Sequence, residues 1–350
     1  MVLTRRGLAL SAAAVMILSA ALIAQKKDDK KQSDAQKKDT LDIVKITDGA
    51  SAGQPMTNDF GLAWGREDYL KATNNKEYVP FTVTFDASKV TSGSTVALYW
   101  RVVAKDAGAT ATLTLPAAKK DDKDSKNKPA ARYAYEDINF IPAGMGRLSR
   151  AITVGAGAYD VYVVLREQAS TQKNAPAPKT SIIKQTITVP DFWSPDLATS
   201  SVIAASRIEP LNAPLSPNEQ SERPYALGMM EIVPALDMKF TTKGELSIFM
   251  LIYNPKTDPM NKPDVTVEYN FYQKPAGAAE KFFNKTSPQV LNVTTLPAAF
   301  DMSLGHQLQT GQAVPLMSFP AGDYRLEIKV TDKLSTKSLT RDVNFTVTAG

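Results

Sequence analysis

Apolar residues alternate with polar ones through several short segments of this chain. In residues 81–85 (FTVTF) threonines separate the apolar side chains, and the same spacing returns in residues 157–165 (GAYDVYVVL). Successive side chains of a strand point to opposite faces, so a period of two indicates a strand with one face on a core. Further segments of this kind are residues 96–102, 133–141 and 148–154 and a segment that ends at Val189. The pattern predicts a first domain of antiparallel strands.

The second half of the chain repeats this order of segments. The matching segments are residues 248–252, 265–269, 324–330 and 343–347. Trp100 precedes Tyr159 by 59 residues in the first copy. Tyr269 precedes Tyr324 by 55 residues in the second copy. Two copies of one structural unit are therefore expected.

Each copy contains about seven short strands, with turn signals at regular intervals and no helical period. Strands without covering helices bury their apolar faces against a second sheet. We therefore predict an all-β chain of two tandem immunoglobulin-like antiparallel β-sandwiches. Trp100 and Tyr269 are expected to be the large core aromatic residues of the two central strands.

A glycine two residues before a tyrosine opens the same strand in both copies. These pairs are Gly157 with Tyr159 and Gly322 with Tyr324. In a tyrosine corner the ring packs inside the sandwich and the hydroxyl bonds back to the chain, while glycine permits the tight approach. We predict such a corner in each domain.

The N-terminus carries the signals of export. Arg5 and Arg6 precede an uncharged run at residues 7–24, and the chain turns strongly polar at Gln25. This order is typical of a secretory signal peptide. A retained membrane anchor is the alternative, because a spanning helix needs about 20 apolar residues. The paired arginines also resemble, weakly, a twin-arginine signal.

Four regions are expected along the chain. They are a signal peptide at 1–24, a polar disordered tail at 25–56, and sandwiches at 57–190 and 191–350. The tail contains KKDDKKQSDAQKKD, whose interleaved charges are typical of a solvated, disordered segment. After signal cleavage no membrane insertion is expected.

Composition excludes several classes of function. The chain has no cysteine, so disulfides, thiolate metal sites and cysteine nucleophiles are excluded. The formal net charge is +5, but the lysine runs are mixed with aspartates, unlike the basic face of a nucleic-acid binder. A second mixed run at residues 119–128 (KKDDKDSKNK) lacks the turn glycine of a calcium loop.

The chain offers little catalytic chemistry. His306 is the only histidine, and no serine lies in a strand-to-helix elbow. Adjacent carboxylates such as Glu67 and Asp68 would point to opposite faces of a strand. We predict a non-enzymatic protein without catalytic residues, cofactor or metal. An enzyme with an unconventional site stays open as an alternative.

Two strands are apolar on both faces, so we expect a cover over an outer sheet surface. In the first copy Tyr162 and Val164 lie opposite the Tyr159 face. In a strand of the second copy, Phe249, Leu251 and Tyr253 likewise lie opposite the face of Ile248, Met250 and Ile252. The sister domain, a proline-rich loop at 209–225, a partner protein and a glycan are the possible covers. If a surface of the first domain is covered, we expect it to be the one with Tyr162 and Val164.

Other aromatic residues extend the possible contact surface. Phe192 and Trp193 lie where the two domains join, and we expect them to pack between the domains. Trp64 and Tyr272 are the candidates for stacking on a sugar ring.

Longer stretches resemble a module found in exported proteins of Acidobacteria-type bacteria. Examples are DFWSPDLATSSVIAASRIEPL at 191–211 and FPAGDYRLEIKVTDKLSTKSLTRDVNFTV at 319–347. That module accompanies GWxTD-domain proteins and von Willebrand factor A-related proteins. The resemblance covers most of the mature chain and implies an immunoglobulin-like sandwich of unassigned role. Residues 63–66 (AWGR) do not match GWxTD and no D-x-S-x-S motif is present, so no functional residue is carried over.

These observations lead to one functional expectation. The protein is expected to be exported to the periplasm or cell surface of a bacterium. There it would act as a protein–protein interaction or scaffolding module for an unknown envelope or secreted protein. Binding of carbohydrate or peptidoglycan is the alternative.

Overall fold

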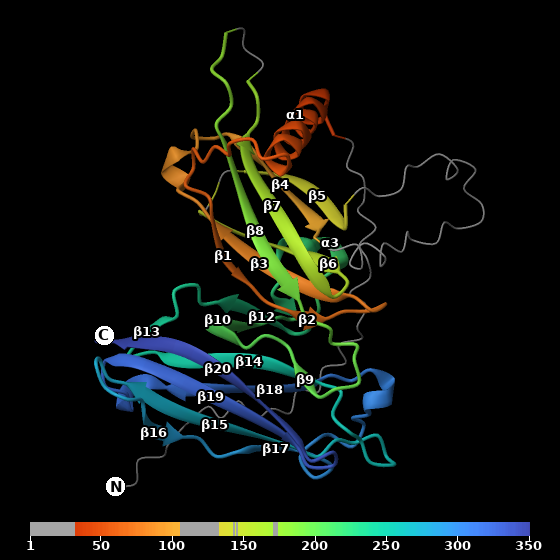
Figure 1. Ribbon diagram of the computed structural model, residues 1–350, viewed down its shortest axis with the longest axis vertical. Helices are drawn as coiled ribbons and strands as arrows, with labels where there is room; N and C mark the ends of the chain where they lie inside the picture. Colours follow the sequence, from red (N-terminus) through yellow and green to blue (C-terminus); the bar gives the residue numbers. More distant parts are fainter. Residues whose placement is uncertain (1–31, 106–132, 143, 145, 171–173) are drawn as a thin grey trace, which may run out of the picture. The chain divides into compact units, whose positions relative to one another are not determined.

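The computed structural model describes residues 32–105, 133–142, 144, 146–170 and 174–350. The predicted signal peptide and the charged run at 119–128 lie outside these residues. The chain forms two compact units, and the boundary between them in the sequence falls between Asp191 and Phe192. Both units are β-sandwiches, as predicted, and their strands pair antiparallel except for Lys239–Thr241, which pairs in parallel with the last strand (Figure 1).

The first sandwich consists of two four-stranded sheets. In one of them β3 (Glu77–Thr84) pairs with β1 (Ala63–Glu67), β2 (Leu70–Lys71) and β6 (Arg147–Val154). The other has the order β5 (Tyr135–Pro142), β4 (Thr95–Ala104), β7 (Gly157–Glu167) and β8 (Thr180–Val189).

The second sandwich consists of two six-stranded sheets. One has the order β11 (Ala226–Leu227), β12 (Met230–Pro234), β10 (Ile203–Pro210), β14 (Glu245–Tyr253) and β18 (Leu308–Pro315), and β9 (Ala198–Thr199) also pairs with β14. The other has the order β13 (Lys239–Thr241), β20 (Lys337–Thr348), β19 (Gly322–Asp332), β15 (Val265–Lys274) and β16 (Lys281–Lys285), and β17 (Gln289–Leu291) also pairs with β15.

The pairing of the central strands is the same in both units. Strand β3 pairs with β6 as β14 pairs with β18, and β4 pairs with β7 as β15 pairs with β19. The last two strands form the hairpins β7–β8 and β19–β20. The repeated sequence pattern therefore corresponds to a repeated topology.

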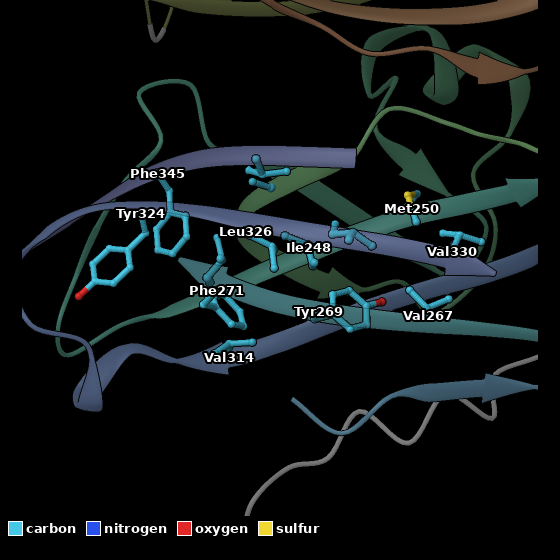
Figure 2. Packing of buried hydrophobic residues seen from close by; sticks show 14 of the residues in the cluster. Ile248, Met250, Val267, Tyr269, Phe271, Val314, Tyr324, Leu326, Val330 and Phe345 are labelled. Atoms are coloured by element: carbon cyan, nitrogen blue, oxygen red, sulfur yellow. The ribbon is translucent and has the colours of Figure 1, made fainter. Parts of the chain in front are cut away.

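Apolar side chains of the two sheets meet inside each sandwich. In the second, Ile248 and Met250 come from one sheet and Tyr269, Phe271 and Leu326 from the other (Figure 2). In the first, Trp100 is 2% exposed and its ring lies edge-on to that of Phe81. Trp100 and Tyr269 are core residues, as predicted.

Both tyrosine corners are present. The hydroxyl of Tyr159 donates to the carbonyl oxygen of Gly155 at 2.9 Å, and that of Tyr324 donates to Pro320 at 2.7 Å. Gly157 and Gly322 have φ angles of 145° and 153°, which L side chains rarely adopt. The two copies therefore share this local geometry.

The prediction of a disordered tail at residues 25–56 is wrong for most of the part that the structure describes. Residues Asp34–Ser51 form helix α1, which begins with a capping box between Ser33 and Gln36. Ile43 of this helix is 0% exposed. The polar composition indicated disorder, but the helix is stabilised by one stripe of buried side chains and does not need an apolar sequence.

The proline-rich segment is not a simple loop. It contains helix α3 (Pro217–Glu222), which begins with a capping box between Ser216 and Glu219. After it the chain returns as β12, which pairs with β10. The chain that follows the segment thus extends the edge of a sheet in the second sandwich.

We expect Tyr159→Phe and Tyr324→Phe each to lower the free energy of unfolding of its own sandwich by about 1 kcal/mol, because each removes one intramolecular hydrogen bond. Urea unfolding followed by fluorescence measures both values. An unchanged midpoint in either variant would show that its corner hydroxyl contributes nothing.

Candidate functional site

The outer face of the sheet β5–β4–β7–β8 is covered by helix α1. We call it the helix-covered face; its buried apolar residues are Ala97, Tyr99, Tyr162, Val164 and Ile182. Tyr162 and Val164 are therefore covered, as predicted. This helix was not among the possible covers considered from the sequence, because it belongs to the segment predicted to be disordered.

The contact has an apolar centre. Ile43 is fully buried between the helix and the sheet, and Val44, Ile46 and Ala50 pack around it. Leu41 lies on the outer side of α1 and is 62% exposed. One stripe of the helix thus faces the sheet while the rest faces water, the arrangement of an amphipathic helix.

A buried ion pair lies on one side of this centre. Arg166 of β7 donates through Nη1 to Oδ1 of Asp39 at 2.7 Å, and its Nη2 lies 3.5 Å from Asp42. The side chains of Arg166 and Asp39 are 9% and 1% exposed. Neither charge could stay in this position alone, because an unpaired buried charge is strongly unfavourable.

A second arginine binds the C-terminal part of the helix. Arg101 of β4 donates to Asp48 at 2.5 Å and to Glu136 of β5 at 3.0 Å. Its guanidinium carbon lies 3.9 Å from the ring centre of Tyr133, whose hydroxyl also donates to Asp48. Burial disfavours the charged form of Arg101, but hydrogen bonds to Asp48 and Glu136 outweigh it and raise its pKa.

The candidate sugar-stacking rings already contact other side chains. Trp64 stacks on Phe81 with 4.9 Å between ring centres, and its Nε1 donates to Glu67. Tyr272 is half-buried, with the guanidinium carbon of Arg325 4.4 Å from its ring centre. The structure therefore gives both residues packing roles within their own sandwiches.

The first aromatic residue of the junction packs onto the second sandwich. Phe192 packs on Tyr253 with 5.0 Å between ring centres, and Asn254 donates to the Phe192 carbonyl oxygen. Trp193 is 39% exposed. Phe249 and Leu251 are buried and, with Tyr253, alternate along β14 with the core residues Ile248, Met250 and Ile252.

Sequence reasoning missed a second surface, at one end of the second sandwich (Figure 1). We call it the loop tip and define it as residues 254–264, 292–307 and 333–336. The ammonium of Lys262, 6% exposed, donates to three carbonyl oxygens of the next loop, those of Pro297, Ala298 and Phe300.

The third loop is fixed by a buried carboxylate. Asp332 is 0% exposed and accepts hydrogen bonds from the N–H groups of Lys256 and Leu334 and from the Ser335 hydroxyl. These bonds join the ends of two loops. Lys262 and Asp332 therefore hold the three loops of the tip in one arrangement.

Large apolar side chains are exposed on these loops. They are Met260 (65%), Val293 (53%), Leu304 (72%) and Leu334 (36%). Met260 and Leu334 occur singly in polar stretches of sequence, whereas Val293 and Leu304 have other apolar residues nearby. Only the fold brings their loops to the same end of the sandwich.

His306 has a structural contact in the loop tip. Its Nδ1 accepts the N–H of Asp301 at 3.0 Å, and its ring lies 5.8 Å from that of Phe300. Among the described residues no group of three or more His, Asp or Glu side chains could hold a metal ion. None of the helices within the described ranges is long and apolar enough to cross a membrane.

Comparison with known proteins gives no assignment. No family model and no curated protein matches the chain. Among solved structures, Escherichia coli α-2-macroglobulin in its native conformation matches 85% of this chain at 13% identity, with a TM-score of 0.21. The trypsin-activated form (85%, 12% identity, TM-score 0.22) and the elastase-activated form (84%, 11% identity, TM-score 0.22) match similarly. This chain spans 16%, 17% and 35% of those chains, and likeness at these TM-scores carries no functional inference.

We expect Asp39→Asn to loosen α1, because Arg166 would keep only the more distant Asp42. Removing one partner of a buried ion pair costs about 3–5 kcal/mol of stability. Here the loss cannot exceed the free energy with which α1 docks on the sheet, because undocking returns Arg166 to water. Limited trypsin digestion should cut after the exposed Lys45 at least about tenfold faster.

Asp34→Asn is the matched control, because the Asp34 side chain is 97% exposed. It should be cut at the wild-type rate. Equal rates for Asp39→Asn and wild type would show that the Arg166 pair does not hold the helix.

Proposed function

We propose that this chain is an exported, non-enzymatic protein–protein interaction or scaffolding module of the bacterial cell envelope. The observation that carries the proposal is the loop tip of the second sandwich, where exposed apolar side chains stand on loops held by buried hydrogen bonds. Export is supported by the order of basic, uncharged and polar segments at the N-terminus.

The loop tip has two properties that favour protein binding. Exposed apolar groups gain free energy when a partner removes them from water. The bonds of Lys262 and Asp332 reduce the conformational freedom that the loops would otherwise lose on binding. Loops on a rigid sandwich commonly carry binding residues for this reason.

The two alternative functions have less support. Binding of carbohydrate rested on Trp64 and Tyr272, which contact Phe81 and Arg325. An enzymatic function rested on His306, whose Nδ1 accepts a backbone N–H. Neither set of contacts assembles a site around a substrate.

We expect the double substitution Met260→Asp and Leu304→Asp to abolish partner capture by the loop tip. Crosslinking of the mature protein in its native envelope, followed by pull-down, should yield a partner that the double variant loses. Both side chains are exposed, so the melting temperature should stay within a few degrees of wild type.

Met317→Asp is the matched control. Met317 is 85% exposed and follows β18, whose end pairs with the beginning of β14, at the opposite end of the sandwich from the loop tip. It should capture the partner as wild type does. If the wild type, the double variant and Met317→Asp all captured the partner equally, a binding role of the loop tip would be contradicted.

A further inference from the structure

We propose that the helix-covered face is a second binding site, which takes an acidic amphipathic helix of a partner protein, and that α1 is its internal competitor. This site is on the first sandwich and is independent of the loop tip. Helix α1 shows the chemistry of the ligand, because it already occupies the site within the same chain.

The contacts of α1 define what a competing helix must carry. Asp39 and Asp48 are nine residues apart, or roughly 13 to 14 Å along a helix, and they bind Arg166 and Arg101. Ile43 lies between them in the apolar centre. A ligand therefore needs two carboxylates at this spacing around a β-branched or similar apolar residue.

The exposed face would be complementary to such a helix. Without α1 it would present Tyr162, Val164 and Ile182 beside the charged groups of Arg101 and Arg166. An apolar surface flanked by guanidinium groups favours an amphipathic segment with carboxylates over a purely apolar one.

Helix α1 is suited to leave the face. Its sequence contains β-branched residues at Thr40, Ile43, Val44 and Ile46 and a glycine at Gly49, so it is a poor helix former by itself. Helices of this length are marginal in water without tertiary contacts. Its helical state therefore depends on docking.

The connection to the sandwich permits undocking. Residues 52–56 are exposed, and the first backbone bond to β8 is made by Thr57, whose carbonyl oxygen accepts the N–H of Ile182 at 2.9 Å. Release of α1 would therefore break no strand pairing of either sheet. A short exposed connector also keeps the helix near the face, where it competes at high effective concentration.

The second sandwich shows that this fold does not require a helix over the outer face of the corresponding sheet. At the positions matching Tyr162 and Val164 it has Glu327 and Lys329. Its Arg325 is bound by Glu280, Glu327 and Asp342 of its own unit. That face satisfies its own charges, whereas the first sandwich draws Asp39, Asp42 and Asp48 from a helix.

The test uses the full mature chain and a fluorescent peptide of residues 32–54, which contains α1 and its capping box. In the chain variant Ile43→Asp, a carboxylate would enter the apolar centre and release the internal helix. We expect this variant to bind the peptide at least tenfold more tightly than the wild-type chain does. The same peptide with Ile43→Asp should bind at least tenfold more weakly to it.

Leu41→Asp in the chain is the matched control, because Leu41 is on the same helix but faces water. This variant should bind the peptide as weakly as wild type. The proposal is overturned if the Ile43→Asp chain binds no better than the Leu41→Asp chain, or if the altered peptide binds as well as the original.

Hydrogen exchange of the unaltered chain gives a second measurement that does not depend on the folding of a variant. Amides of α1 should exchange at least 100-fold faster than those of β7, because the helix opens without the sandwich. Excess peptide should expose the α1 amides further. Equal protection of α1 and β7 would show that the helix is a fixed part of the sandwich and would overturn the proposal.

Discussion

The arrangement of the first domain depends on two guanidinium groups buried in an apolar sheet face. Arg101 and Arg166 stand on the adjacent strands β4 and β7, among tyrosine, valine and isoleucine side chains. Buried charges need partners of opposite charge. Among the described residues of the sheet, Glu136 supplies one carboxylate, which binds Arg101. Helix α1 supplies Asp39, Asp42 and Asp48. The cover is thus fixed by charge as well as by apolar contact.

The two sandwiches share a frame and differ in what their outer faces require. The pairing of the central strands and the tyrosine corner are the same in both, because they depend on core residues and on one glycine. On the outer face of β19, Arg325 donates hydrogen bonds to Glu280, Asp342 and Glu327, and these bonds outweigh burial and raise the pKa of Arg325. That face needs no helix. A duplicated fold has in this way acquired different surfaces, with a loop tip on one copy and a helix-covered face on the other.

Much of the fold could be predicted from the sequence. A period of two indicates strands directly, and the Gly-x-Tyr pairs identify the corner because few residues tolerate that backbone. Helix α1 was missed because its helicity depends on docking, and the mixed charges around it resemble a disordered tail. Two signals could have revealed it, namely the capping box of Ser33 and Gln36 and the arginines within the apolar strand sequences. The loop tip left no local signal, because Met260 and Leu304 lie on neighbouring loops only after folding.

The most direct test of the central claim is a double-mutant cycle between Asp39 and Arg166. The docking free energy of α1, obtained from hydrogen exchange of its amides, would be compared for Asp39→Ala, Arg166→Ala and the double variant. Contact between the two charges predicts a coupling energy of about 1–3 kcal/mol, and the exposed Asp34 paired with Arg166 in the same way should give about zero. Additive effects of Asp39→Ala and Arg166→Ala would contradict an arginine–aspartate pair that holds the helix on the sheet.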